Sequence, residues 1–235
     1  MGIIVPAIIP TSLRDLEEKL ARLKGVATEI QIDIIDGVYA SPASWPYVPG
    51  GTLAPDGQLP FLSDFRFEMD LMVKNPEEVT GAWIAAGATR IVAHLESTAY
   101  LPRLITDMKE KYGHEKGFAA NLLSFGIAIQ VDTNMELLEP YLPEVDFVQF
   151  MGIKRIGVQG QPFATEVLNH IAVFRAKHPD IPVQVDGGVH IAVAPRVLAA
   201  GVSRLIVGSD IWNATSAKDE YERLNELTEE HGLYT

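Results

Sequence analysis

Apolar residues recur along the chain in two alternating patterns. Short runs with alternating polar and apolar positions predict strands at 4–9, 29–35, 66–72, 89–94, 126–131, 146–151, 182–185 and 204–207. Between several of them, apolar residues spaced three or four apart predict helices at 12–23, 75–86, 100–112, 164–177, 191–200 and 217–230. Because strands that alternate with helices form parallel sheets, eight such units predict a closed (β/α)₈ TIM barrel of the α/β class. An open doubly wound sheet is the alternative.

The second βα unit is irregular. Residues 38–65 contain five prolines, at positions 42, 46, 49, 55 and 60, together with Gly50, Gly51 and Gly57. Since proline and glycine at this density prevent a regular helix, we expect the second helix to be missing or very short. The segment is either a long surface loop or, because it carries aromatic residues, a lid or a subunit contact.

Polar residues interrupt the strands at the positions that face the inside of the predicted barrel. These positions are Gln31, Asp33, Ile35, Glu68, Asp70, Met72, Gln149, Met151, Gln184 and Asp186, of which seven are polar. The residues between them are apolar and are expected to pack against the helices. The period of two therefore directs polar groups toward the barrel axis.

Three of these inward residues are aspartates at or near the carboxyl ends of their strands, Asp33, Asp70 and Asp186. Catalytic groups in such barrels come from those ends. Burying unpaired carboxylates is unfavourable by several kcal/mol each, so the cluster requires a cation or raised pKa values. The cation would be a divalent metal or the pair Lys154 and Arg155. The alternative is that each side chain only satisfies neighbouring donors.

Glycines follow the last strands of the predicted barrel. Gly187 and Gly188 come after the seventh strand, and Gly208 precedes Ser209 after the eighth. Loops at these two positions commonly bind phosphate in this architecture, because exposed backbone N–H groups hold the anion. The loop after the sixth strand adds Gly157 and Gly160. Together they predict an anion site opposite the aspartates.

Composition limits the classes of function. The chain has 235 residues, 47% of them hydrophobic, which suits one domain spanning 1–235. A net charge of −12 disfavours nucleic acid and anionic membranes as partners. The absence of cysteine excludes disulfides and thiolate nucleophiles, and it agrees with a reducing compartment. With no signal-peptide pattern at the start and no apolar stretch long enough to span a bilayer, a cytoplasmic location is expected.

Several motifs, in order, resemble the ribulose-phosphate 3-epimerase family. QIDIIDG is similar to the H-x-D-x-M-D-G motif of that family, and FEMDLMVKNPE is similar to D-V-H-L-M-x-x-x-P-E. IVAHLES resembles the fourth-strand H-x-E segment, and FVQFMGIKRIGVQGQPF resembles the sixth strand with its P-G-F-G-G-Q-x-F loop. VQVDGGV and LIVGSDIW are similar to the last two strand ends. The resemblance covers most of the chain.

The resemblance implies a metal-assisted proton transfer at C3 of a ketose phosphate, with Asp33 and Asp186 as the acid and base on opposite faces. It implies that the substrate is held by Met72, Met151, Gly187, Gly188, Gly208 and Ser209, and the loop glycines Gly157 and Gly160 are assigned to the same substrate site. The metal would be held by Gln31, Asp33, Asp70 and Asp186. Because these ligands are all oxygens, Mg²⁺ or Mn²⁺ is favoured over Zn²⁺. A homo-oligomer is expected only by analogy.

The sequence also departs from the family. Gln31 and Asp70 stand where the family has metal-binding histidines, and Ile35 replaces a methionine. Three functions therefore stay open: an epimerase, a non-catalytic sugar-phosphate binder that has no metal, and a lyase or decarboxylase acting on a phosphorylated substrate. The third requires an Asp-x-Lys-x-x-Asp run, which Asp70 and Lys74 do not reproduce. His94 is expected to be a hydrogen-bonded structural residue, and membership of the site is the alternative.

Overall fold

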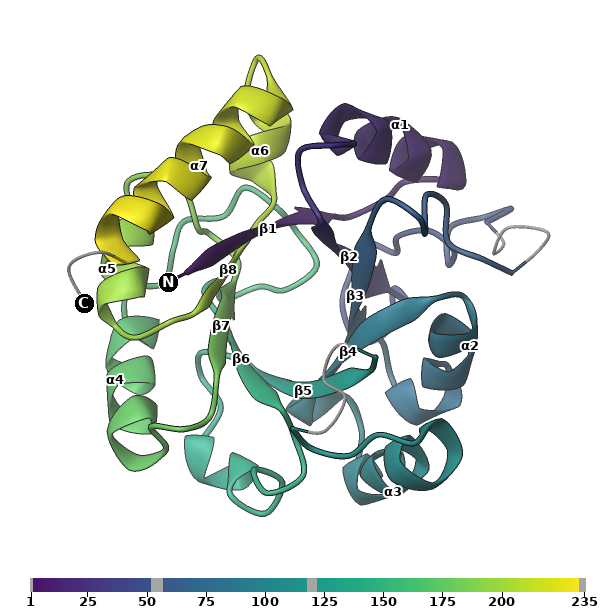
Figure 1. Ribbon diagram of the computed structural model, residues 1–235. Coiled ribbons are helices and arrows are strands. Elements are labelled where there is room, and N and C mark those ends of the chain that lie inside the picture. Colours follow the sequence, from purple (N-terminus) through teal and green to yellow (C-terminus); the bar gives the residue numbers. More distant parts are fainter. Residues whose placement is uncertain (1, 52–56, 118–121, 233–235) are drawn as a thin grey trace.

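Eight parallel strands close into a barrel in the order of the sequence, which confirms the predicted TIM-barrel fold (Figure 1). The computed structural model describes residues 2–51, 57–117 and 122–232. The strands are β1 (Ile3–Ile8), β2 (Glu29–Ile35), β3 (Arg66–Met72), β4 (Ala88–His94), β5 (Ser124–Ile129), β6 (Phe147–Met151), β7 (Val183–Asp186) and β8 (Arg204–Val207). Each strand pairs with the next, and β8 returns to β1, so the sheet has no free edge.

Helices surround the barrel on its outer face (Figure 1). The α-helices are α1 (Leu13–Leu23), α2 (Thr80–Ala85), α3 (Leu101–Tyr112), α4 (Val167–Lys177), α5 (Ala194–Ala199), α6 (Ser209–Asn213) and α7 (Ala217–Gly232). Short 3₁₀ turns are η1 (Pro76–Glu78), η2 (Leu95–Ser97) and η3 (Met135–Leu138). Within the described parts of the chain, no helix has the length and apolar character needed to cross a membrane.

Some predicted helices are shorter than expected. The helix predicted over 75–86 is divided into η1 and α2, and it starts after Asn75, whose backbone is left-handed with a φ of 55°. The helix predicted over 191–200 is reduced to α5, which begins next to Pro195. Residues 209–213, where no helix is predicted, form α6. Periodicity identified the elements, whereas local backbone geometry decided where they end.

No helix follows β2 among described residues 36–51 and 57–65, as the proline content predicted. Ser44 replaces the missing helix as the local anchor. Its hydroxyl donates to the Asp33 carbonyl at 2.9 Å and accepts from the Ile35 amide at 2.9 Å. This buried serine therefore fixes the loop to the carboxyl end of β2.

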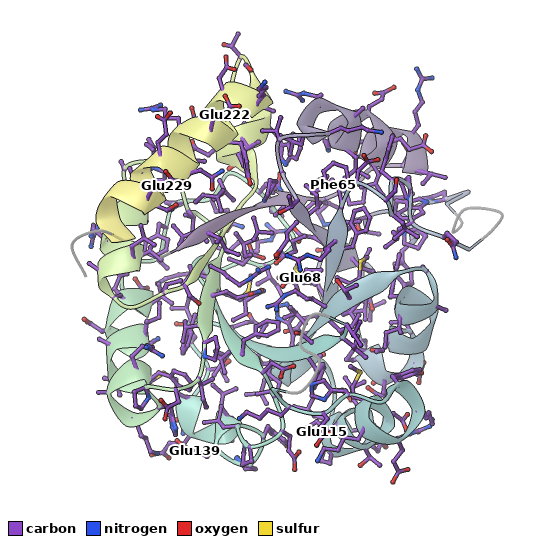
Figure 2. All side chains as sticks on the ribbon, viewed as in Figure 1. Phe65, Glu68, Glu115, Glu139, Glu222 and Glu229 are labelled. Carbon is purple, nitrogen blue, oxygen red and sulfur yellow. The ribbon has the colours of Figure 1, made fainter. Side chains whose placement is uncertain are left out.

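The barrel has two different kinds of core. The side chains between strands and helices are apolar and form the main hydrophobic cluster. Inside the ring of strands, polar side chains are stacked in layers, and Glu68 lies in this interior (Figure 2). The strand register pairs Gln31 with Glu68 and Asp33 with Asp70, so the second pair lies closer to the carboxyl ends. Alternation along parallel strands thus brings the polar residues together.

Candidate active site

Three aspartates from different strands meet at the carboxyl end of the barrel. Asp33 comes from β2, Asp70 from β3 and Asp186 from β7. One carboxylate oxygen of each lies within 4.8 Å of the other two. All three residues are buried, with exposed fractions of 4%, 0% and 7%. The convergence that the sequence predicted is therefore present.

Gln31 bridges two of the carboxylates. Its Nε2 donates to Oδ1 of Asp33 and to Oδ2 of Asp186, each at 2.8 Å. Its Oε1 is buried and has no hydrogen-bond partner. An unpaired buried oxygen next to a carboxylate cluster lowers stability. A cation bound by the carboxylates would be a partner for Gln31 Oε1 if the Gln31 amide rotated by 180° and exchanged its oxygen and nitrogen.

Asp70 is held by two side chains that the sequence did not assign to the site. His94 Nε2 lies 2.9 Å from Oδ1 of Asp70, and Gln149 Nε2 donates to Oδ2 at 2.9 Å. The sequence signal for Gln149 was present in its inward position on β6. The prediction that His94 is only a structural residue is incomplete, because its imidazole contacts Asp70 of the carboxylate cluster directly.

Burial and mutual repulsion shift the ionisation of the cluster. Loss of solvent, followed by the negative charges of Asp186 and Asp70, raises the pKa of Asp33 well above its usual range. Burial and Asp70 raise the pKa of Asp186 in the same way. Burial opposes protonation of His94, but Asp70 outweighs it and raises the pKa of the imidazole. Without a cation, the site therefore retains protons that exposed aspartates lose.

A cavity extends from the aspartates to the glycine loops. Asp33 and Asp186 line one side of it. The predicted substrate contacts that line the same cavity are Met72, Met151, Gly157, Gly160, Gly187, Gly188, Gly208 and Ser209. Gln31 and Asp70 lie behind this surface and do not line it. The structure thus brings together every residue that the sequence assigned to substrate.

The proposed role of Lys154 and Arg155 as neutralising cations is wrong for Lys154, which forms an exposed ion pair with Glu166 at 2.9 Å. Arg155 is exposed, and its carbonyl accepts from Gln161 in the same loop. The loop after β6 leaves these charges at the surface because its inward positions are occupied by apolar residues such as Ile153 and Ile156.

A second polar layer lies deeper in the barrel. Glu68 accepts from Arg90 Nε at 2.5 Å and from Arg204 at 3.2 Å. Burial alone would raise the pKa of Glu68, but the two guanidinium groups outweigh it and hold that pKa below its usual range. This layer is charge-compensated by protein side chains, unlike the three aspartates above it.

Sequence comparison identifies the family. Residues 3–212 match the sequence model of the "Ribulose-phosphate 3 epimerase family". The chain belongs to the ribulose-phosphate 3-epimerase family. It is 25% identical over 222 residues to ribulose-phosphate 3-epimerase from Schizosaccharomyces pombe, covering 92% of this chain and 89% of that protein. It is 27% identical over 221 residues to the Bacillus subtilis enzyme, covering 92% and 94%.

Solved structures support the fold at lower sequence identity. 3-Hexulose-6-phosphate synthase from Salmonella typhimurium superposes with a TM-score of 0.70 at 13% identity, covering 97% of this chain and 99% of that one. KGPDC from Streptococcus mutans superposes with a TM-score of 0.69 at 10% identity, covering 96% of each chain. At this identity the likeness describes the barrel alone.

The cluster keeps both aspartates of the ribulose-phosphate 3-epimerase motif, at Asp33 and Asp186. Gln31 and Asp70 occupy the two positions where that motif has histidines. The remaining donors fit a divalent cation. Three carboxylate oxygens lie close together, two of the carboxyl groups have raised pKa values, and the buried Gln31 oxygen has no partner. An all-oxygen set suits a hard ion.

Proposed function

We propose that this chain is a sugar-phosphate 3-epimerase that moves a proton at C3 of a ketose phosphate. One observation carries the proposal: Asp33 and Asp186 face the same cavity, which ends at the glycine loops after β7 and β8. Membership of the epimerase family supports the same reaction class. The substrate would lie between the two carboxyl groups, with its phosphate among the glycine amides.

The two aspartates suit paired acid and base roles. Burial and the negative charges of neighbouring carboxylates raise both pKa values, so one carboxyl group can hold a proton at a pH where an exposed aspartate has lost its own, while the other accepts one. Base and acid must act on opposite faces of a planar intermediate, and the two residues come from strands β2 and β7. Gln31 donates to both and keeps them oriented.

A divalent cation would be held by Asp33, Asp70 and Asp186, and by the Gln31 oxygen after rotation of the Gln31 amide, which would release its two hydrogen bonds to the aspartates. When bound, it would offset the negative charge that develops on the substrate oxygens. Asp70 has no proton-transfer role in this scheme, since it lies behind the cavity surface. Its carboxylate, held by His94 and Gln149, is available as a ligand.

The other functions considered have less support. A decarboxylase on this barrel would require a lysine among the carboxylates, but Lys74 is exposed and its backbone amide donates to Asp36. A binding protein without catalysis would not need two buried carboxyl groups facing the ligand, because unpaired buried carboxylates lower stability.

Solvent exchange tests the proposal. The purified protein with Mn²⁺ should incorporate deuterium at C3 of a pentulose phosphate in D₂O. Asp186→Asn should reduce that exchange by about 10³-fold or more, because an amide cannot take up the proton, while inorganic phosphate affinity changes little. Asp132→Asn, at an exposed position, is the matched control. Normal exchange in Asp186→Asn would contradict the role assigned to Asp186.

A further inference from the structure

A chain of side-chain hydrogen bonds crosses the barrel interior from its amino-terminal end to the carboxylates. Gln184 Oε1 accepts from Arg204 Nε at 3.1 Å and from Arg90 at 3.3 Å. Gln184 Nε2 donates to Gln149 Oε1 at 2.6 Å. Gln149 Nε2 then donates to Oδ2 of Asp70 at 2.9 Å. Five strands contribute to this route: β8 and β4 through the arginines, β7 and β6 through the glutamines, and β3 through Asp70.

The two arginines determine which way each amide in this series of hydrogen bonds points. A guanidinium group has only donors, so the oxygen of Gln184 must face Arg90 and Arg204. Its nitrogen must then face Gln149, and that orientation forces the Gln149 nitrogen toward Asp70. Turning the Gln149 amide over would place two nitrogens 2.6 Å apart and two oxygens 2.9 Å apart, losing both bonds.

The surroundings leave these side chains little freedom. Gln149, Gln184 and Asp70 are all fully buried. The Gln184 nitrogen also donates to Glu68 at 2.7 Å, and the guanidinium of Arg90 lies 4.0 Å from the centre of the Phe147 ring. In a buried network with most groups satisfied, the orientation of one amide dictates that of the next.

From this geometry we infer that Gln149 and Gln184 are positioning residues, which orient the Asp70 carboxylate from behind. This role rests on the proposed function, in which Asp70 is a cation ligand. Gln149 holds Oδ2 and His94 holds Oδ1, so the carboxylate cannot rotate away from Asp33 and Asp186. Asp70 stands at a family histidine position, and an aspartate there requires its own support.

Two substitutions interrupt this series of hydrogen bonds, one next to Asp70 and one a residue further away. Gln149→Leu removes the donor to Asp70 and keeps the shape of the side chain. Gln184→Glu keeps the acceptor for both arginines and removes the donor to Gln149 and to Glu68. Gln184 acts on Asp70 only through Gln149. We expect each to weaken Mn²⁺ affinity by about 10-fold or more, the usual effect of losing a residue that orients a metal ligand.

Val148→Ala is the control for lost stability. Val148 precedes Gln149 on β6, and its buried side chain belongs to the apolar cluster outside the barrel. This variant should melt at a lower temperature yet bind Mn²⁺ as tightly as the unmodified chain. Inorganic phosphate affinity should be the same in all variants. If the two glutamine variants bind Mn²⁺ as tightly as Val148→Ala, the positioning role is overturned although the proposed function stands.

A second measurement does not depend on metal or catalysis. In protein labelled with ¹⁵N-glutamine, the side-chain amide hydrogens of Gln149 should exchange slowly with solvent. Gln184→Glu should shift these resonances and speed their exchange, because Gln149 Oε1 loses its donor. Unchanged Gln149 resonances in Gln184→Glu would overturn the inference. An unmodified chain that binds Mn²⁺ but does not exchange C3 would count against the proposed function alone.

Discussion

Gly188 holds in place, through its backbone, the end of the cavity where we propose that phosphate binds. Its φ is +69°, and a Cβ added there would lie 2.7 Å from Cα and 2.9 Å from N of Phe163. Backbone atoms cannot move aside as a side chain can. At Gly208 the nearest atoms belong instead to the flexible Gln159 side chain. The loops after β6 and β7 therefore approach each other at Gly188 because it has no side chain.

Replacing Gly188 by alanine should displace the loop that carries Phe163 and lower the free energy of unfolding by about 1–3 kcal/mol. Affinity for inorganic phosphate should fall, measured by calorimetric titration. Gly113→Ala is the control, because its φ of +68° is nearly the same but nothing lies within 4 Å of the added carbon. Equal losses of stability in both variants, with phosphate affinity kept, would contradict this role of Gly188.

At the scale of elements, β2 and the loop after it show how a strand end is fixed without a helix. Ser44 N donates to the Ile35 carbonyl at 2.9 Å, and the Ser44 hydroxyl bonds to backbone groups of Asp33 and Ile35. The same short segment carries a catalytic candidate. The position of Asp33 thus depends on a loop anchor as well as on the sheet.

Ser44→Ala should leave the Ile35 N–H without its buried hydroxyl partner and reduce the free energy of unfolding by about 1–3 kcal/mol. Because Asp33 lies at the released strand end, we expect kcat for C3 exchange to fall more than phosphate affinity. Denaturant unfolding and exchange kinetics would measure both. Ser63→Ala, on the exposed part of the loop, is the matched control. Loss of stability without any change in kcat would show that Ser44 does not position Asp33.

At the scale of the whole molecule, the barrel interior holds two layers of charge with opposite responses to pH. The pKa values of Asp33 and Asp186 are raised, so their contribution to stability is present in acid and is lost as pH rises through the raised values. The pKa of Glu68 is lowered, so its contribution is present above the ordinary value of about 4.3 and is lost in acid.

The melting temperature of the metal-free protein should therefore fall as pH rises from the ordinary carboxyl pKa toward the raised values of Asp33 and Asp186. Mn²⁺ should raise the melting temperature more at alkaline than at acidic pH, because the ionised aspartates bind it and the protonated ones do not. Melting curves with Mn²⁺ and with a chelator, recorded across pH, would measure this. If Mn²⁺ raised the melting temperature equally at every pH, the ion would bind at a site other than the three aspartates.

Much of the site was predictable from position alone. The alternation of β2, β3 and β7 directed Asp33, Asp70 and Asp186 inward, and the glycines after β7 and β8 marked the cavity wall that we propose binds phosphate. These inferences needed only the period of a strand and the parallel arrangement of the units. Helix ends were less predictable, since the left-handed backbone of Asn75 precedes η1 and Val79 separates η1 from α2.

The amino-acid sequence by itself determined the barrel, the inward carboxylates and the glycine loops, because each follows from local periodicity. Only the tertiary structure decided which groups hold Asp70, namely His94 and Gln149, and that Lys154 pairs with Glu166 instead. Hydrogen bonds between side chains on different strands depend on the register of the closed barrel. That register is a property of all eight strands together, and no single stretch of sequence contains it.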